Sequence, residues 1–121
     1  MSYDDNNIFA KILRGEIPCN KIYEDDFVLS FYDINPQKKI HALVIPKGKY
    51  VDLDDFSQNA SPEEMIGLLK GIKTVTKKLG ISTDSGRGYR AITNVSENGG
   101  QEVPHLHFHL FGGEKVGKMV E

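Results

Sequence analysis

The stretch HLHFHLFGG, residues 105–113, shows the strongest periodic pattern in the sequence and indicates both a strand and a chemistry. It holds three of the four histidines of the sequence, and apolar residues fill the positions between them. Side chains at alternate positions of a β-strand share a face, whereas a helix would scatter both sets. We therefore expect a strand over 105–111 with histidines on one face and core residues on the other. The histidines are His105, His107 and His109, and the apolar residues are Leu106, Phe108 and Leu110.

Outward from this stretch, the patterning predicts a domain of mixed helix and sheet. Glycine and proline breaks separate segments in which apolar residues recur at helical or strand spacing. The expected elements are a helix over 6–14, the two strands of a hairpin over 21–23 and 27–32, a strand over 40–45, a helix from Ser61 to Leu79 and a strand over 88–95. Short links between the strands favour an antiparallel sheet with helices packed on it, which is an α+β fold.

Composition and charge narrow the class of protein. The chain has 121 residues, 39% hydrophobic and 26% charged, and no repeat or linker, so we expect one domain over 1–121. A net charge of −2 argues against a nucleic-acid polymer as partner. Cys19 is the only cysteine, which excludes an intrachain disulfide and a multi-cysteine zinc site. We find neither a secretory signal nor an apolar run of the roughly 20 residues that span a bilayer, and expect a cytoplasmic protein without a membrane partner.

From the residues alone, three uses of the histidine face remain open. The face could be an ordinary solvated strand surface, or three imidazoles could hold a catalytic zinc ion. Alternatively, an imidazole with a pKa near its usual value of about 6.5 is largely neutral at pH 7 and can attack an electrophile. Gly99-Gly100, just upstream, can turn backbone N–H groups toward an anion and favours the third use, with phosphate as the target.

Residues 105–111 match the pattern His-φ-His-φ-His-φ-φ, where φ is apolar, and resemble the signature of the histidine triad (HIT) superfamily. The segments IFAKILRGEIP, YEDD, FYDINPQ, HALVIPK and NGGQEVPHLHFHLFGG resemble its Hint branch, the nucleoside phosphoramidate hydrolases. The resemblance implies a HIT-like fold, with a five-stranded antiparallel sheet, two helices, and a homodimer in which the sheets of two copies join. Residues 1–6 would be a flexible N-terminus and residues 114–121 a C-terminal tail.

The resemblance also implies a reaction that needs no metal or other cofactor. His107 would attack the α-phosphorus of a purine nucleoside 5′-phosphoramidate, and an amine would leave. Water would then release AMP or GMP from the nucleotidyl-histidine. His105, His109 and His41 would orient the nucleophile, and Asp33 would hold the ribose hydroxyls, which a carboxylate accepts well as hydrogen-bond donors.

Further residues carried over by the resemblance would form a nucleotide pocket. An apolar slot for the base would consist of Ile8, Phe9, Ile12, Phe31 and Ile34. The surroundings of the phosphate would consist of Asn94, Gly100, Gln101, Glu102 and Val103, by side chain or backbone. Without the resemblance, the five apolar residues would be read only as core.

Two departures from the Hint pattern concern the leaving group. Glu102 stands where eukaryotic members have a serine near the leaving nitrogen, and one hypothesis is that Glu102 recognises a basic amine, such as a lysine-derived one. Residues 114–121 lack the Trp-Pro-Pro ending of some Hint proteins, so the sequence does not specify the amine. Two alternative functions are a dinucleoside polyphosphate hydrolase, which the Gly112-Gly113 pair disfavours, and a nucleotide-binding regulatory protein with weak catalysis.

Overall fold

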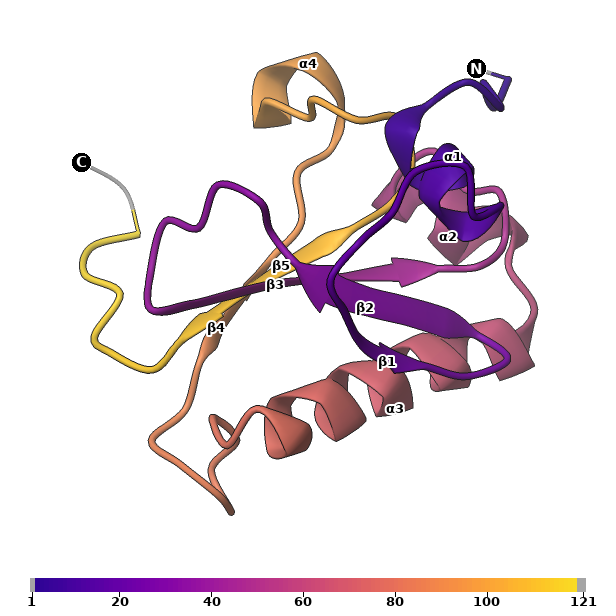
Figure 1. The fold of residues 1–121 in the computed structure, drawn as a ribbon. Helices are drawn as coiled ribbons and strands as arrows, with labels where there is room; N and C mark the ends of the chain where they lie inside the picture. Colours follow the sequence, from indigo (N-terminus) through magenta and orange to yellow (C-terminus); the bar gives the residue numbers. More distant parts are fainter. Residues whose placement is uncertain (1, 120–121) are drawn as a thin grey trace.

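Five strands form one antiparallel sheet in the computed structural model, which describes residues 2–119. The strands are β1 (Lys21–Glu24), β2 (Val28–Tyr32), β3 (Ile40–Pro46), β4 (Arg90–Ile92) and β5 (Phe108–Gly112). Their order across the sheet is β1-β2-β3-β5-β4, and each neighbouring pair is antiparallel. The α+β fold expected from the sequence is therefore confirmed, with β3 at the centre of the sheet between β2 and β5 (Figure 1).

Four helices accompany the sheet within residues 2–119: α1 (Ile8–Leu13), α2 (Leu53–Asn59), α3 (Pro62–Lys78) and α4 (Ser96–Gly99). The sequence predicted α1 and α3. At the start of α3 the Ser61 hydroxyl accepts from the Glu64 N–H at 3.1 Å, and the Glu64 carboxylate accepts from the Ser61 N–H at 3.0 Å. The sequence pattern did not predict α2, which buries only Phe56 and so has no apolar stripe, or α4, which is a single turn.

The sheet carries a helix on each face. In Figure 1, α3 runs below the sheet, where its buried residues form a core with alternate residues of β2, β3 and β5. α1 lies above the sheet, where Phe9 packs with Phe31 and Leu43. Because both faces of β3 are covered, its sequence is an apolar run rather than an alternating pattern.

The strand that carries the histidine motif begins later in the chain than the sequence predicts, at Phe108 instead of residue 105. The ladder between β3 and β5 starts at Val44 and Phe108. His105 and His107 therefore precede β5, although the sequence predicted a strand from residue 105. A loop holds the backbone there instead, because the Leu106 N–H donates to the Tyr50 carbonyl oxygen at 2.8 Å. The predicted alternation still holds, since Leu106 is fully buried in the core that α3 covers.

The strand predicted over 88–95 is also shorter in the structure than in the prediction. β4 spans only Arg90–Ile92, which pair with Phe111 to His109 of β5. Beyond β5, the Glu114 carboxylate accepts from the Lys39 N–H at 2.6 Å, and this ties the tail to the start of β3. Met1, Val120 and Glu121, the ends of the predicted N-terminal segment and tail, lie outside the described residues. Across residues 2–119, no helix combines the length and apolar character needed to cross a membrane.

Candidate active site

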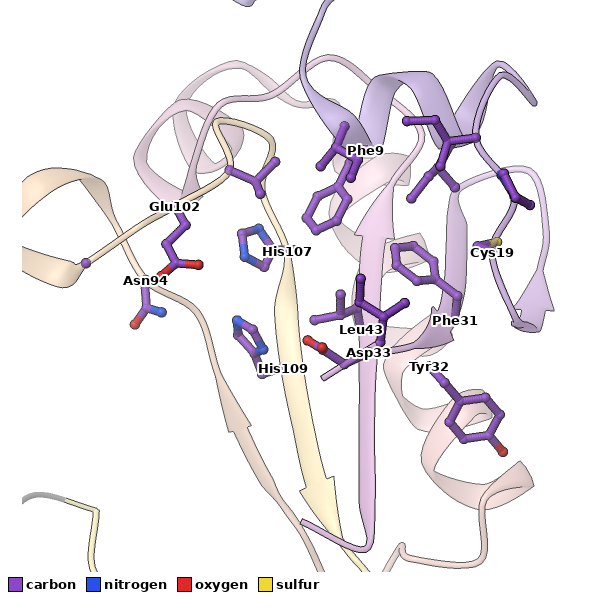
Figure 2. A pocket seen from close by; sticks show the side chains of 17 residues that line it. Phe9, Cys19, Phe31, Tyr32, Asp33, Leu43, Asn94, Glu102, His107 and His109 are labelled. Carbon is purple, nitrogen blue, oxygen red and sulfur yellow. The ribbon is translucent and has the colours of Figure 1, made fainter. Parts of the chain in front are cut away.

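A cavity of about 490 Å³ opens between α1, the end of β2 and the loop that leads from α4 to β5. His107 and His109 line it, with the apolar residues of α1 and β2 on one side and Asn94 and Glu102 on the other (Figure 2). The predicted nucleotide-binding residues that line it are Ile8, Phe9, Ile12, Phe31, Asp33, Ile34, Asn94, Gly100, Glu102 and Val103. The structure therefore gathers these residues, from distant parts of the sequence, around one cavity.

Three predicted site residues do not line the cavity. His105 and His41 are buried, 0% and 4% exposed, and reach the cavity through hydrogen bonds to His107 and His109. The Gln101 side-chain amide donates to the carbonyl oxygens of Val51 at 2.7 Å and Val103 at 3.0 Å. Gln101 therefore shapes the loop with its side chain, and its role beside a phosphate stays a prediction.

Several residues of the cavity were missed by the sequence analysis. They are Ile17, Pro18, Cys19, Tyr32 and Leu43. Leu43 pairs directly with Phe31 across β2 and β3, so the strand register would have found it. Cys19 was read as plain packing, and burial raises the pKa of its thiol, so it stays protonated and acts as an apolar wall.

The hydrogen bond of His107 defines its tautomer. Its Nδ1 lies 2.7 Å from the carbonyl oxygen of His105, and a carbonyl can only accept, so Nδ1 carries the proton. The Nε2 atom of neutral His107 then holds a lone pair. This Nε2 atom has no hydrogen-bond partner in the described part of the chain. Because every buried polar side-chain atom within residues 2–119 has a partner, Nε2 is not buried and is open to the cavity that His107 lines. His107 thus presents a nucleophilic nitrogen.

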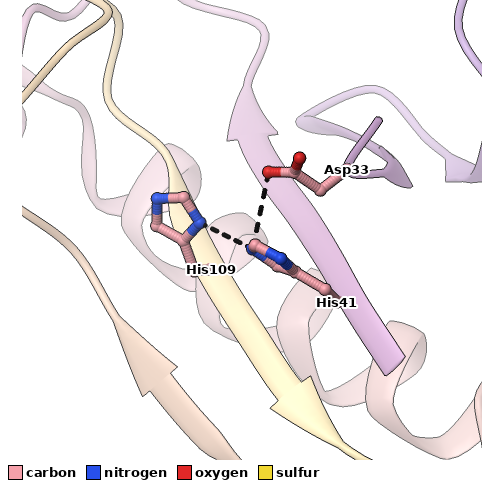
Figure 3. Close-up of side chains that lie close together, drawn as sticks. All are labelled: Asp33, His41 and His109. Carbon is pink, nitrogen blue, oxygen red and sulfur yellow. Dashed lines mark hydrogen bonds and ion pairs between the residues drawn. The ribbon is translucent and has the colours of Figure 1, made fainter. Parts of the chain in front are cut away.

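A second set of hydrogen bonds defines the tautomers of His41 and His109. The backbone N–H of Gln37 donates to His41 Nδ1 at 3.1 Å, so neutral His41 carries its proton on Nε2. That Nε2 lies 3.0 Å from His109 Nδ1 and 3.4 Å from an oxygen of Asp33 (Figure 3). His109 Nδ1 is therefore an acceptor, and His109 carries its own proton on Nε2.

The two cavity histidines are consequently complementary. Their ring centroids are 5.1 Å apart, and one ring offers a lone pair while the other offers an N–H donor. Such a pair can attack an electrophilic centre and donate a hydrogen bond to the group that leaves.

Burial keeps the four imidazoles neutral near pH 7. Loss of solvation lowers the pKa of His105 and of His109 to about 4 each, and neighbouring imidazoles add to the effect on His109. Loss of solvation also lowers the pKa of His107 and of His41, although the Asp33 carboxylate opposes the shift in both. A neutral His107 is the form that can attack.

Within residues 2–119, one group of side chains is arranged closely enough to bind a metal ion, but its hydrogen bonds oppose metal binding. Asp33, His41 and His109 each offer a ligand atom, and these atoms lie within 4.8 Å of one another. A metal ion would need the Nε2 lone pair of His41, but the Gln37 N–H fixes the proton on that nitrogen. The donor set therefore fits a hydrogen-bond network better than a metal ion.

A contact from the N-terminal segment completes the site. Residues 1–6 were expected only to form a flexible N-terminus, and no role in the site was predicted for them. The Tyr3 hydroxyl lies 2.5 Å from His105 Nδ1. The Nε2 atom of His105 lies 2.8 Å from the Pro46 carbonyl oxygen and must donate, so Nδ1 accepts from Tyr3. No local sequence signal links two residues so far apart in the chain.

Comparison with known proteins places this geometry in a family. A family model described as "HIT domain" matches residues 14–116. A HIT-like protein from Azospirillum brasilense is 50% identical over 119 residues, which cover 98% of this chain and 95% of that protein. A purine nucleoside phosphoramidase from Escherichia coli is 40% identical over 117 residues, covering 96% and 94%. The solved structure of a HIT family hydrolase from Clostridium thermocellum superimposes with a TM-score of 0.84 at 37% identity, covering 98% and 99% of the two chains.

Proposed function

This chain belongs to the HIT family of hydrolases, and on that premise we propose that it cleaves the P–N bond of purine nucleoside 5′-phosphoramidates. The observation that carries the proposal is the pairing of tautomers, with a lone pair on His107 Nε2 beside a proton on His109 Nε2. The similarity to the Escherichia coli phosphoramidase supports the choice of bond.

In the first step, His107 Nε2 attacks the α-phosphorus and an N–P bond to the enzyme forms as the bond to the leaving nitrogen breaks. The His109 N–H donates a hydrogen bond to the leaving nitrogen. That nitrogen takes up one proton from solvent and departs as a neutral amine. The phosphorylated His107 ring keeps its Nδ1–H and is positively charged, and the His105 carbonyl oxygen at 2.7 Å stabilises that charge.

In the second step, water attacks the same phosphorus and the N–P bond to His107 breaks. The water proton returns to solvent, the nucleoside monophosphate leaves, and neutral His107 is restored. The two steps use the same pair of nitrogens, and no cofactor takes part in the proposed cycle.

The residues that line the cavity support a binding mode for the nucleotide. Phe9 and Phe31, whose ring centroids lie 5.7 Å apart, and Leu43 form an apolar wall suited to a purine base. At the end of β2, Asp33 is placed between this wall and His109, where its carboxylate can accept both ribose hydroxyls. The α-phosphate would then lie beside His107, next to the loop that carries Gly100.

Two further properties belong to this proposal. We expect a homodimer in which the sheets of two copies join, and β4 offers a free edge because it pairs with β5 alone within residues 2–119. We also expect the protein to act in the cytoplasm. Light scattering of the purified protein tests the first expectation, and a monomer would contradict it.

The function is tested by incubating the protein with an adenosine 5′-phosphoramidate, with and without a metal chelator, and quantifying AMP and amine. We expect equal amounts of both products and no effect of the chelator. Diadenosine polyphosphates, tested in parallel, should be poorer substrates. Absence of phosphoramidate turnover, or its loss in chelator, would contradict the proposal.

A further inference from the structure

His105 is the histidine of the motif whose ring does not face the cavity. It is fully buried, and both of its ring nitrogens are bonded, Nε2 to the Pro46 carbonyl oxygen at 2.8 Å and Nδ1 to the Tyr3 hydroxyl at 2.5 Å. The Tyr3 ring also packs edge-on against the imidazole, with centroids 5.5 Å apart. His105 is thus clamped between the end of β3 and the N-terminal segment.

We propose that Tyr3 is a positioning residue for the nucleophile, acting through His105. The backbone carbonyl oxygen of His105 accepts the Nδ1–H of His107 at 2.7 Å, and this bond determines which nitrogen of His107 carries the lone pair. The ring anchors of His105 hold the residue, and therefore its carbonyl, in place. The catalytic consequence of this role rests on the proposed function, whereas the positioning itself does not.

Removal of the hydroxyl has a defined physical effect. Nδ1 of His105 becomes a buried acceptor without a partner, which is a costly state. We expect the ring to turn away from this position, because only the Pro46 anchor then holds it, and a turned ring displaces the carbonyl from His107. His107 then also populates the tautomer with its proton on Nε2, and that tautomer has no lone pair with which to attack phosphorus.

Several contacts of the N-terminal segment show that Tyr3 is held against His105. The carbonyl oxygen of Asp4 accepts from the Asn7 side-chain amide at 2.8 Å, which ties the segment to the start of α1. Asp5 pairs with Lys49 at 2.9 Å, and its carbonyl oxygen accepts from the Arg14 guanidinium at 2.9 Å. The segment is therefore connected both to α1 and to the loop after β3.

The test compares Tyr3→Phe with Tyr89→Phe, a matched change at a tyrosine that is 40% exposed and outside the cavity. ¹⁵N NMR of the histidine rings reports the tautomers without any substrate, and kinetics on an adenosine phosphoramidate report turnover. In Tyr3→Phe we expect the His107 nitrogens to shift toward a tautomer mixture. We expect kcat to fall about three- to tenfold with little change in KM. Tyr89→Phe should match the wild type in both measurements.

Unchanged His107 nitrogens in Tyr3→Phe would overturn the proposal, whatever the activity. A shift of those nitrogens in a protein that does not cleave phosphoramidates would sustain the positioning role and refute the proposed function instead. If Tyr3→Phe does not fold, the wild-type spectrum decides. His105 Nδ1 must there be unprotonated and accept a hydrogen bond, and a protonated Nδ1 would overturn the proposal.

Discussion

Nε2 of His41 on β3 lies 3.0 Å from Nδ1 of His109 on β5, and this contact links the central strand of the sheet to its neighbour at the cavity. The Gln37 N–H fixes the proton of His41 on Nε2. His109 Nδ1 therefore accepts a hydrogen bond from His41, and the proton of His109 lies on Nε2, on the side of the cavity. The backbone of the loop between β2 and β3 thereby determines the proton position on a ring of the neighbouring strand β5.

Replacement of His41 tests this dependence. In His41→Ala the His109 ring loses its donor and populates both tautomers, so we expect kcat to fall about tenfold to a hundredfold with little change in KM. His41→Gln restores an N–H donor without a titratable ring and should recover part of the loss. Steady-state kinetics check both, and a His41→Ala enzyme with wild-type kcat would show that the contact has no catalytic role.

Replacement of His107 separates binding from chemistry. His107→Ala removes the nucleophile but leaves Asp33 and the apolar wall, so turnover should fall at least about a thousandfold while AMP still binds. Calorimetry with AMP measures the binding, and circular dichroism confirms the fold. Persistent turnover in a folded His107→Ala protein would show that His107 is not the nucleophile.

Glu102 offers a test of leaving-group preference. Both charged side chains that line the cavity, Asp33 and Glu102, are acidic, and no lysine or arginine within residues 2–119 lines it. A cationic leaving amine would offset this negative charge, so the ratio of kcat/KM for cationic over neutral amines should fall about threefold in Glu102→Gln. Glu102→Ser should behave in the same way.

Glu97→Gln, on the exposed α4 and outside the cavity, is the matched control for Glu102 and should leave the ratio unchanged. If the ratio in Glu102→Gln and Glu102→Ser equals that of the wild type, Glu102 does not recognise the amine.

The lowered histidine pKa values predict a loss of stability in mild acid. Burial lowers the pKa of His105 from 6.5 to about 4, so between these values the unfolded chain binds more protons than the folded one. Stability should therefore decline as pH falls from 6.5 to 4, by up to about 3 kcal/mol from His105 alone. Carboxylates with lowered pKa, such as Glu24, lowered from 4.5 to about 2, add to the decline only at the lower end of this window and below it.

Urea unfolding between pH 4 and 8 measures this decline. His105→Gln lacks the titrating ring and should show a weaker dependence on pH across the same window. A free energy of unfolding that is flat between pH 6.5 and 4 in the wild type would contradict the account.

The local pattern of the motif was sufficient to predict which of its residues face the core that α3 covers. Strict alternation requires Leu106 and Leu110 to face the core, and this holds although the ladder begins only at Phe108. The capping box of α3 was also readable, because it depends on residues three positions apart. The sequence could not predict α2, whose Asp52 cap precedes a helix with a single buried residue.

The hydrogen bonds that assign the chemistry were not readable from local pattern. His41 and His109 are 68 positions apart and meet only through the register of β3 and β5. Tyr3 and His105 are 102 positions apart, in segments that share no strand pairing. The residues of the site were predicted through a family resemblance, whereas the proton positions required the three-dimensional arrangement.

The most direct test of the central claim is intact-protein mass spectrometry after rapid acid-free quenching of a reaction with an adenosine phosphoramidate in the presence of chelator. We predict a covalent adenylyl adduct that peptide mapping places on His107 and that is absent in His107→Ala. Release of AMP by the wild type without any trappable adduct, or an adduct on another residue, would contradict the claim.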